Sequence, residues 1–319
     1  MISRRAALIL TAAAGGTLFP SPGMAGEPGH GQPTFANRTP LSIRSARLAV
    51  RDLDRMTAFY RDVVGLREVD RDGRSVQLGA GGTVLLELLV RPDALPDDPR
   101  SAGLYHTAFL MPTRLDLARW VANAMVRRFR IDGASDHLVS EAIYLTDVEG
   151  NGIEIYSDRA PGRWRWAGGQ IEMATDQLDF RDLMAEVGPD TEPWEGVPDG
   201  LRIGHMHLRV GDLGRGETFY AGLLGLDVVR RRSGASFLSS GRYHRHVGMN
   251  VWQSLGAPER DLRRSGLAGF EFAVADSVQI DRIGRRMMEG GATVASVPRG
   301  IAVTDPWGTE VRLTAGNAA

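Results

Sequence analysis

Residues 48–53 read LAVRDL and residues 208–213 read LRVGDL, so one motif occurs twice in the chain, 160 residues apart. Each copy is followed at the same distance by a Phe-Tyr pair, at 59–60 and at 219–220. A match that keeps its spacing over such a stretch predicts a duplicated structural unit. The motif is therefore the starting point for the fold.

Each copy is expected to contain two smaller units of one kind. The alternating run that ends at Asp52 predicts a strand, and the Phe-Tyr pair predicts the apolar face of a helix that precedes further strands. In the second unit, the turn DVEG at 147–150, matched by DPWG at 305–308, predicts a hairpin. We expect an α+β fold of four βαβββ modules in two tandem domains. The modules lie near 43–90, 103–158, 203–255 and 266–315, and the domains at 40–158 and 201–316 are joined by a connector at 159–200.

The composition excludes several classes of function. The 38 basic and 39 acidic residues give a net charge of -1, so no basic field exists for nucleic acid or for an anionic membrane. Cysteine is absent, which excludes disulfides, thiolate ligands and thiol nucleophiles. Any metal must then be held by histidine and carboxylate. The expected partner is a small molecule, and a homo-oligomer is compatible with this composition.

The first 25 residues are typical of an export signal. Arg4 and Arg5 precede an apolar stretch at 6–19, which is shorter than the about 20 residues that cross a bilayer. A small-x-small cleavage site follows at 23–25. The paired arginines resemble a twin-arginine signal, so we expect an exported or periplasmic protein that is secreted in its folded state.

Four short strings carry a family resemblance. They read GLYH at 103–106, SEAIY at 140–144, IGHMH at 203–207 and YHRH at 243–246. Together with the βαβββ modules, they make the chain resemble the vicinal-oxygen-chelate (VOC) superfamily of glyoxalases, bleomycin-resistance proteins and extradiol dioxygenases. Within it, the strings are similar to those of the bacillary type of catechol 2,3-dioxygenase. The resemblance covers essentially the whole mature chain and implies two tandem VOC domains around one metal site.

In that superfamily the metal ligands lie on the first and last strands of paired modules. The first-strand positions of the four modules hold Ser45, His106, His205 and Gly269 in order. The last-strand position holds a carboxylate, Glu154, in module two, whereas Arg312 occupies it in module four. The resemblance therefore implies a site built by modules two and three.

The implied ligands are His106, Glu154 and His205. Two imidazoles and one carboxylate form the triad that non-haem iron oxygenases use, and it leaves three coordination positions free for substrate and dioxygen. Fe²⁺ is the expected ion, and Mn²⁺ is the alternative. His207 lies two residues from His205 on the same strand face and is a rival ligand.

The resemblance also implies residues for proton transfer. The resemblance places His246 on the expected last strand of module three, where relatives carry an acid–base histidine, and His244 is its rival. Tyr144 precedes Glu154 by ten residues, the spacing at which extradiol enzymes place a tyrosine beside the bound oxygens. His137 resembles another pocket histidine, although it lies further from Tyr144 than in many relatives.

These features imply an extradiol ring-cleaving dioxygenase that acts on catechol or a substituted catechol with dioxygen. Two alternatives stay open, which are a metal-dependent lyase or isomerase of the glyoxalase kind and a metal-free drug-binding protein. The first usually needs a fourth, carboxylate ligand, and no Asp or Glu occurs between Phe237 and Pro258. The second does not require a His/His/Glu set.

Overall fold

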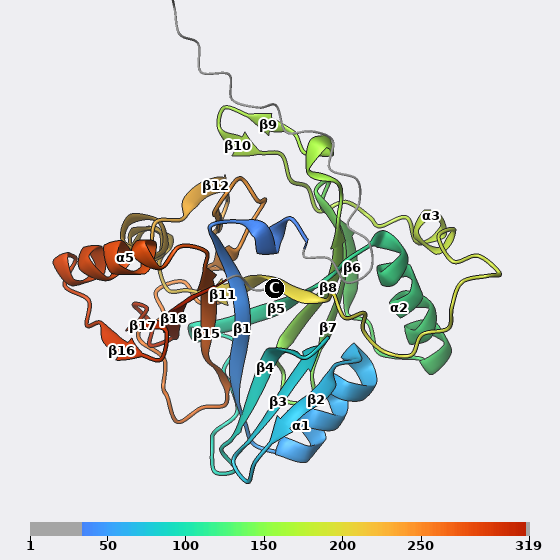
Figure 1. Cartoon of the computed structure of the whole chain (residues 1–319), viewed down its shortest axis with the longest axis horizontal. Coiled ribbons are helices and arrows are strands. Elements are labelled where there is room, and N and C mark those ends of the chain that lie inside the picture. Colours follow the sequence, from blue (N-terminus) through green and yellow to red (C-terminus); the bar gives the residue numbers. More distant parts are fainter. Residues whose placement is uncertain (1–33, 317–319) are drawn as a thin grey trace, which may run out of the picture.

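The fold is seen in a computed structural model that describes residues 34–316 (Figure 1). The export signal expected at residues 1–25 lies outside the described residues, so export stays a prediction. Four βαβββ modules are present, as expected for this α+β fold, and each has one helix and four strands.

The bounds of the elements follow the order of the chain. Module one contains β1 (Leu41–Val50), α1 (Leu53–Phe59), β2 (Arg67–Arg71), β3 (Ser75–Ala80) and β4 (Thr83–Val90). Module two contains β5 (Gly103–Met111), α2 (Arg114–Arg127), β6 (Gly133–Asp136), β7 (Ser140–Thr146) and β8 (Gly152–Asp158). Module three contains β11 (Arg202–Arg209), α4 (Leu213–Glu217), β12 (Asp227–Arg232), β13 (Ala235–Ser239) and β14 (Val247–Asn250). Module four contains β15 (Gly266–Val274), α5 (Ser277–Glu289), β16 (Ala295–Val297), β17 (Gly300–Thr304) and β18 (Glu310–Ala315).

The segment between the halves is ordered and partly regular. It contains the two-stranded β9 (Trp166–Ala167) and β10 (Gln170–Ile171) and the short helix α3 (Phe180–Met184). α3 packs beside α2 (Figure 1). Among the described residues, no helix is long and apolar enough to cross a membrane.

Two eight-stranded sheets form the body of the molecule, and each joins one module from each half of the sequence. The first sheet combines modules one and four in the order β16-β17-β18-β15-β1-β4-β3-β2. The second sheet combines modules two and three in the order β12-β13-β14-β11-β5-β8-β7-β6. At the centre of each sheet an antiparallel pair, β1 with β15 or β5 with β11, connects the halves.

The repeated motif has a specific role in this fold. Asp52 and Asp212 are the N-caps of α1 and α4, and each accepts a hydrogen bond from the backbone N–H three residues on, which stabilises the start of the helix. Each helix then continues into a π-helical turn, η2 (Tyr60–Val64) or η4 (Thr218–Leu223). The tyrosine of each Phe-Tyr pair lies in that turn.

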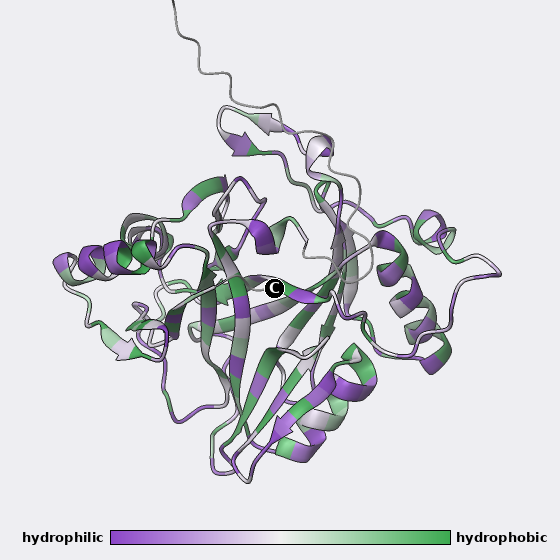
Figure 2. Cartoon of the chain, in the orientation of Figure 1, coloured by the Kyte–Doolittle hydropathy of each residue, from purple (hydrophilic) through white to green (hydrophobic). Residues whose placement is uncertain are grey.

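Both tyrosines connect neighbouring modules. Tyr60 donates to Oδ2 of Asp147 at 3.0 Å, and Tyr220 donates to Oδ2 of Asp305 at 2.9 Å. Figure 2 shows hydrophobic residues along the strands and mixed polar and apolar faces on the helices. The main apolar cluster draws buried side chains from all four modules, so the halves share one core.

Candidate functional site

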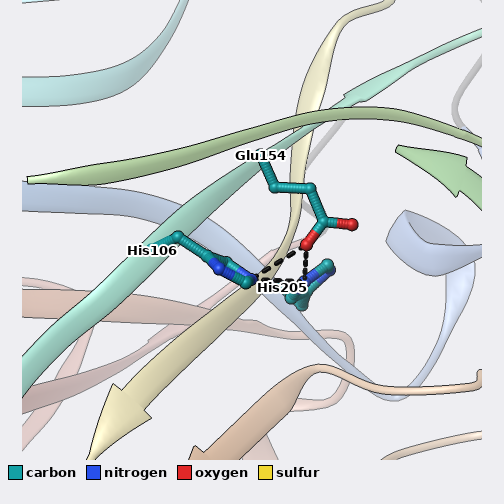
Figure 3. A group of neighbouring side chains, drawn as sticks. All are labelled: His106, Glu154 and His205. Atoms are coloured by element: carbon teal, nitrogen blue, oxygen red, sulfur yellow. Dashed lines mark hydrogen bonds and ion pairs between the residues drawn. The ribbon is translucent and has the colours of Figure 1, made fainter. Parts of the chain in front are cut away.

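The three implied ligands converge on one face of the second sheet (Figure 3). Ala108 on β5 pairs with His205 on β11 at one side and with Glu154 on β8 at the other. His106 precedes Ala108 by two residues and therefore points to the same face of the strand. Register thus brings together three side chains that are distant in the sequence.

The distances within this triad are those of a compact polar cluster. Oε2 of Glu154 lies 2.9 Å from Nε2 of His106 and 3.1 Å from Nε2 of His205, and the two Nε2 atoms are 3.3 Å apart. Among the described residues, these are the His and carboxylate groups whose ligand atoms meet closely enough to hold a metal ion. All three side chains are buried. Two imidazoles and a carboxylate suit a divalent transition metal.

The protonation states favour ligation. Burial disfavours the charged form of Glu154, but the charge of Arg245 and the contacts of Oε2 with both histidines hold its pKa well below the usual range. Burial, followed by repulsion from Arg245, lowers the pKa of His205 well below its ordinary value. A carboxylate and a neutral imidazole are the forms that bind metals.

A chain of hydrogen bonds orients His205 through its Nδ1 atom, on the side of the ring away from Glu154. Its Nδ1 lies 3.2 Å from the hydroxyl of Tyr156, which lies 2.7 Å from the hydroxyl of Tyr243. Tyr243 in turn donates to Asp158 at 3.4 Å, and His244 Nε2 donates to the same oxygen at 2.6 Å. Such outer contacts fix the tautomer and ring orientation of a ligand. His244 therefore belongs to this support and does not line the cavity described next.

A cavity of about 540 Å³ opens at the triad, and His106 and Glu154 lie in its wall. Tyr144 lies there too, because it is the direct cross-strand partner of Glu154 in the β7–β8 hairpin. The ten-residue spacing seen in the sequence is thus the length of a hairpin. His137 lies beside them in the turn between β6 and β7.

Tyr144 and His137 form one hydrogen-bonded pair. Nδ1 of His137 donates to the carbonyl of Ala174 in the connector at 2.7 Å, so Nε2 is free to accept from the Tyr144 hydroxyl at 2.6 Å. Burial, and then repulsion from Arg245, lowers the pKa of His137, whereas burial and the charge of Glu154 raise the pKa of Tyr144 well above its usual value. The neutral imidazole of His137 therefore accepts a hydrogen bond from the neutral phenol of Tyr144 at the cavity wall.

His246 has a different position from the one expected of an acid–base residue. Its Nδ1 accepts from the backbone N–H of Ser240 at 3.2 Å, and its Nε2 donates to the carbonyl of Ala36 at 3.0 Å. The ring is fully buried and does not line the cavity. Because both ring nitrogens already have partners in the chain, this geometry gives His246 no access to a substrate proton.

His207 also differs from His205. It lines the cavity and lies opposite His106 across the β5–β11 pair, but its Nε2 accepts a hydrogen bond from Asn250 at 3.0 Å. Its ring packs against Tyr105 and Trp252 at the wall of the cavity. The geometry therefore groups His205, and not His207, with Glu154.

Sequence reasoning missed Arg245, which contacts the triad. Its Nε lies 3.1 Å from Nε2 of His205, and its Nη2 lies 2.9 Å from Oε1 of Glu154. The sequence offers no signal for this contact, because residues 243–246 form a bent segment before β14, to which strand alternation does not apply.

The first sheet has no comparable cluster within the described residues. Its equivalent central row reads Glu87, Arg47 and Gly269, where the second sheet has Glu154, Ala108 and His205. A side chain at Gly269 would contact Nη2 of Arg47, which forms an ion pair with Glu310. The duplicated position therefore carries an ion pair in place of the candidate metal ligands.

Comparisons with known proteins agree with this architecture. The Glyoxalase/Bleomycin resistance protein/Dioxygenase superfamily matches residues 42–155 and 202–313. A catechol-2,3-dioxygenase of Bacillus subtilis (strain 168) is 36% identical over 269 residues, which are 83% of this chain and 93% of that protein. A crystal structure of a putative dioxygenase from Bacillus subtilis has a TM-score of 0.58 at 14% identity, covering 88% of this chain and 86% of that one. Glyoxalase I from Zea mays has a TM-score of 0.52 at 17% identity, covering 88% and 94%.

The two solved structures show the fold, and the family match with the Bacillus subtilis relative shows the descent. Both matched ranges fall on the module pairs seen here, and together they contain His106, Glu154 and His205. The chain belongs to the glyoxalase/bleomycin resistance protein/dioxygenase superfamily, that is, to the vicinal-oxygen-chelate proteins.

Proposed function

We propose that this protein is an extradiol dioxygenase that opens the ring of a catechol or a substituted catechol. The observation that carries the proposal is the placement of the Tyr144–His137 pair beside the His106, Glu154 and His205 cluster in one cavity. A metal triad and a proton acceptor are the two parts that the reaction needs. The 36% identity to a catechol-2,3-dioxygenase supports the same reaction class.

His106, Glu154 and His205 would hold the ion, which we expect to be Fe²⁺ or Mn²⁺. When bound, such an ion supplies positions for two substrate oxygens and for dioxygen. The donor set fits this use, because three protein ligands leave coordination positions open. Dioxygen is the oxidant, and both of its atoms enter the ring-opened product.

Tyr144 and His137 would move the first substrate proton. The Tyr144 hydroxyl donates to His137, so the lone pairs of its oxygen are available to accept a proton from a catechol hydroxyl. As Tyr144 gains that proton, its own proton passes to Nε2 of His137. Because burial lowers the pKa of His137, its imidazolium releases a proton more readily than an exposed one and can return the proton later.

The cavity favours a substrate larger than catechol itself. Its volume of about 540 Å³ is typical of sites for drug-sized ligands. Phe237, Trp252 and Met173 supply apolar surface, and Arg232 lies in the wall as well. We therefore propose a catechol that carries a substituent.

The rival isomerase function lacks a fourth ligand in this geometry. The position on β14 that corresponds to Glu154 is Gly248, which pairs with His207. A side chain there would meet the ring of His207 at about 3 Å, so this position is closed. Three ligands with open positions favour the dioxygenase.

Metal analysis combined with oxygen uptake tests the proposal. Purified protein loaded anaerobically with Fe²⁺ or Mn²⁺ should retain one equivalent and should consume dioxygen when it is given a series of catechols. Glu154→Ala and His106→Ala should lose the metal, because two remaining ligands hold it weakly. Turnover that continues without dioxygen, or full metal occupancy in either variant, would refute the proposal.

A further inference from the structure

A buried guanidinium lies among the candidate ligands. Arg245 donates from Nε to Nε2 of His205 and from Nη2 to Oε1 of Glu154, at 3.1 Å and 2.9 Å. Its Nη1 has no hydrogen-bond partner among the described residues, although the side chain is buried. The ring-opening reaction proposed above gives this cation no role, so its position needs a separate explanation.

The lone pair of His205 can serve one partner only. Arginine keeps its protons in proteins, so the Nε–H of Arg245 makes Nε2 of His205 a hydrogen-bond acceptor. Nδ1 of the same ring is already used by the Tyr156 hydroxyl at 3.2 Å. A metal ion that coordinates Nε2 of His205 therefore has to displace Arg245 from it.

The charges of Glu154 and Arg245 also imply that a metal ion has to displace the guanidinium. Glu154 and Arg245 form a buried ion pair with a net charge of zero. A divalent ion bound to Glu154 would add two positive charges beside the guanidinium, where burial weakens the screening of their repulsion. Without any cation, the carboxylate of Glu154 would be buried and uncompensated, which is strongly unfavourable.

We propose that Arg245 is a resident cation of this site, which holds His205 and Glu154 together in the metal-free chain and competes with the divalent ion for them. The inference rests on the proposed function, since it takes His106, Glu154 and His205 as metal ligands. Loading is then an exchange, in which the guanidinium leaves His205 as the ion enters.

Mn²⁺ titration of three proteins, measured by calorimetry and by thermal unfolding, tests the exchange. Arg245→Met removes the charge and both donors and keeps an unbranched side chain. Arg209→Met is the matched control, because Arg209 is also buried at this cavity but pairs with Asp97. The third protein is the wild type.

We expect Arg245→Met to bind Mn²⁺ about tenfold or more tightly than wild type, since no charge-assisted hydrogen bonds need to be broken. Its metal-free form should melt at a lower temperature, and Mn²⁺ should raise its Tm by more than it raises that of wild type. Arg209→Met should bind with an affinity within about threefold of wild type, because its charge does not contact the ligands.

The outcomes separate the inference from the function. If wild type and Arg245→Met bind equally well, or if the variant binds more weakly, the exchange is overturned and the metal triad stands. If neither binds Mn²⁺ or Fe²⁺, both proposals fall. If Arg245→Met binds Mn²⁺ and wild type does not, the exchange is supported, because Arg245 then prevents binding altogether.

A measurement on the wild-type chain covers the case in which Arg245→Met does not fold. In ¹⁵N-labelled protein, the buried Nε–H of Arg245 should give a slowly exchanging resonance, identified by its absence in Arg245→Lys. Titration with diamagnetic Zn²⁺ should shift or remove this resonance in step with occupancy. A resonance that is unchanged at saturation would overturn the exchange.

Discussion

At the scale of single residues, the proposed proton transfer from Tyr144 to His137 can be tested directly. With metal content intact, His137→Asn should lower kcat by about 10²–10⁴-fold, as expected for the loss of a proton acceptor. Tyr144→Phe should act similarly, because the proton reaches His137 only through this hydroxyl. Steady-state oxygen uptake and metal analysis of each variant give the answer.

His246→Asn is the informative comparison for these variants. Because its ring is buried away from the cavity, the structure leads us to expect a kcat close to that of wild type. A large loss of rate with full metal content would instead support the acid–base role that the sequence suggests for His246.

The titration of His246 predicts a pH dependence of stability. Burial lowers the pKa of His246 to about 4 in the folded chain, whereas an unfolded histidine titrates near 6.5. Between these values the unfolded chain binds a proton that the folded chain does not, so the free energy of unfolding falls as the pH falls from about 6.5 to about 4. His246 should account for up to about 3 kcal/mol of that loss.

Urea denaturation of wild type and His246→Gln across this range measures the effect. The amide keeps a hydrogen-bond donor for Ala36 but does not titrate, so the variant should lose less stability on acidification. Equal losses in both proteins would mean that His246 titrates normally in the fold.

At the scale of elements, the two tyrosine–aspartate contacts are equivalent in position but not in strength. Oδ2 of Asp147 accepts from Tyr60 and also from the side chain of Asn151 at 2.8 Å. Oδ2 of Asp305 accepts from Tyr220 alone, among the described residues. Burial raises the pKa of both aspartates, so a lost donor is costly at either position.

We expect Tyr220→Phe to lower the free energy of unfolding by about 2 kcal/mol and Tyr60→Phe by about 1 kcal/mol, because only the first leaves a buried carboxylate oxygen without a donor. The midpoints of urea unfolding curves measure both. Neither variant should alter the Kd for Mn²⁺. A larger loss for Tyr60→Phe would contradict this ranking of the two contacts.

At the scale of the whole molecule, each sheet depends on both halves of the chain. The central pairs β1–β15 and β5–β11 each take one strand from each half, and His205 lies across β5–β11 from the other two ligands. A half expressed alone would expose two central strands and an incomplete triad.

Fragments 37–160 and 195–319 should therefore each fail to bind Mn²⁺ tightly, and each should tend to aggregate through its unpaired strands. Coexpression should restore a complex that binds one equivalent, measured by copurification and metal analysis. One equivalent bound by a single fragment would show that the triad is not the site.

The sequence by itself determined the repeat and the four modules, and its family resemblance implied the three candidate ligands. The repeat and the modules could be predicted because they depend on local spacing. An Asp N-cap after a strand fixes where each module begins, and the ten residues from Tyr144 to Glu154 are one hairpin. Residues at a fixed distance from such a landmark take the same place in every module, so His106 and His205 could be compared directly.

The tertiary structure alone decided which modules share a sheet and which side chains reach the cavity. His246 was expected at the site and Arg245 was not, although they are adjacent in the chain. The choice depends on the side to which each residue of that segment points and on the long-range contacts with Ala36, Glu154 and His205. Those contacts join residues far apart in the sequence. They can stabilise a side-chain position only once both sheets have formed.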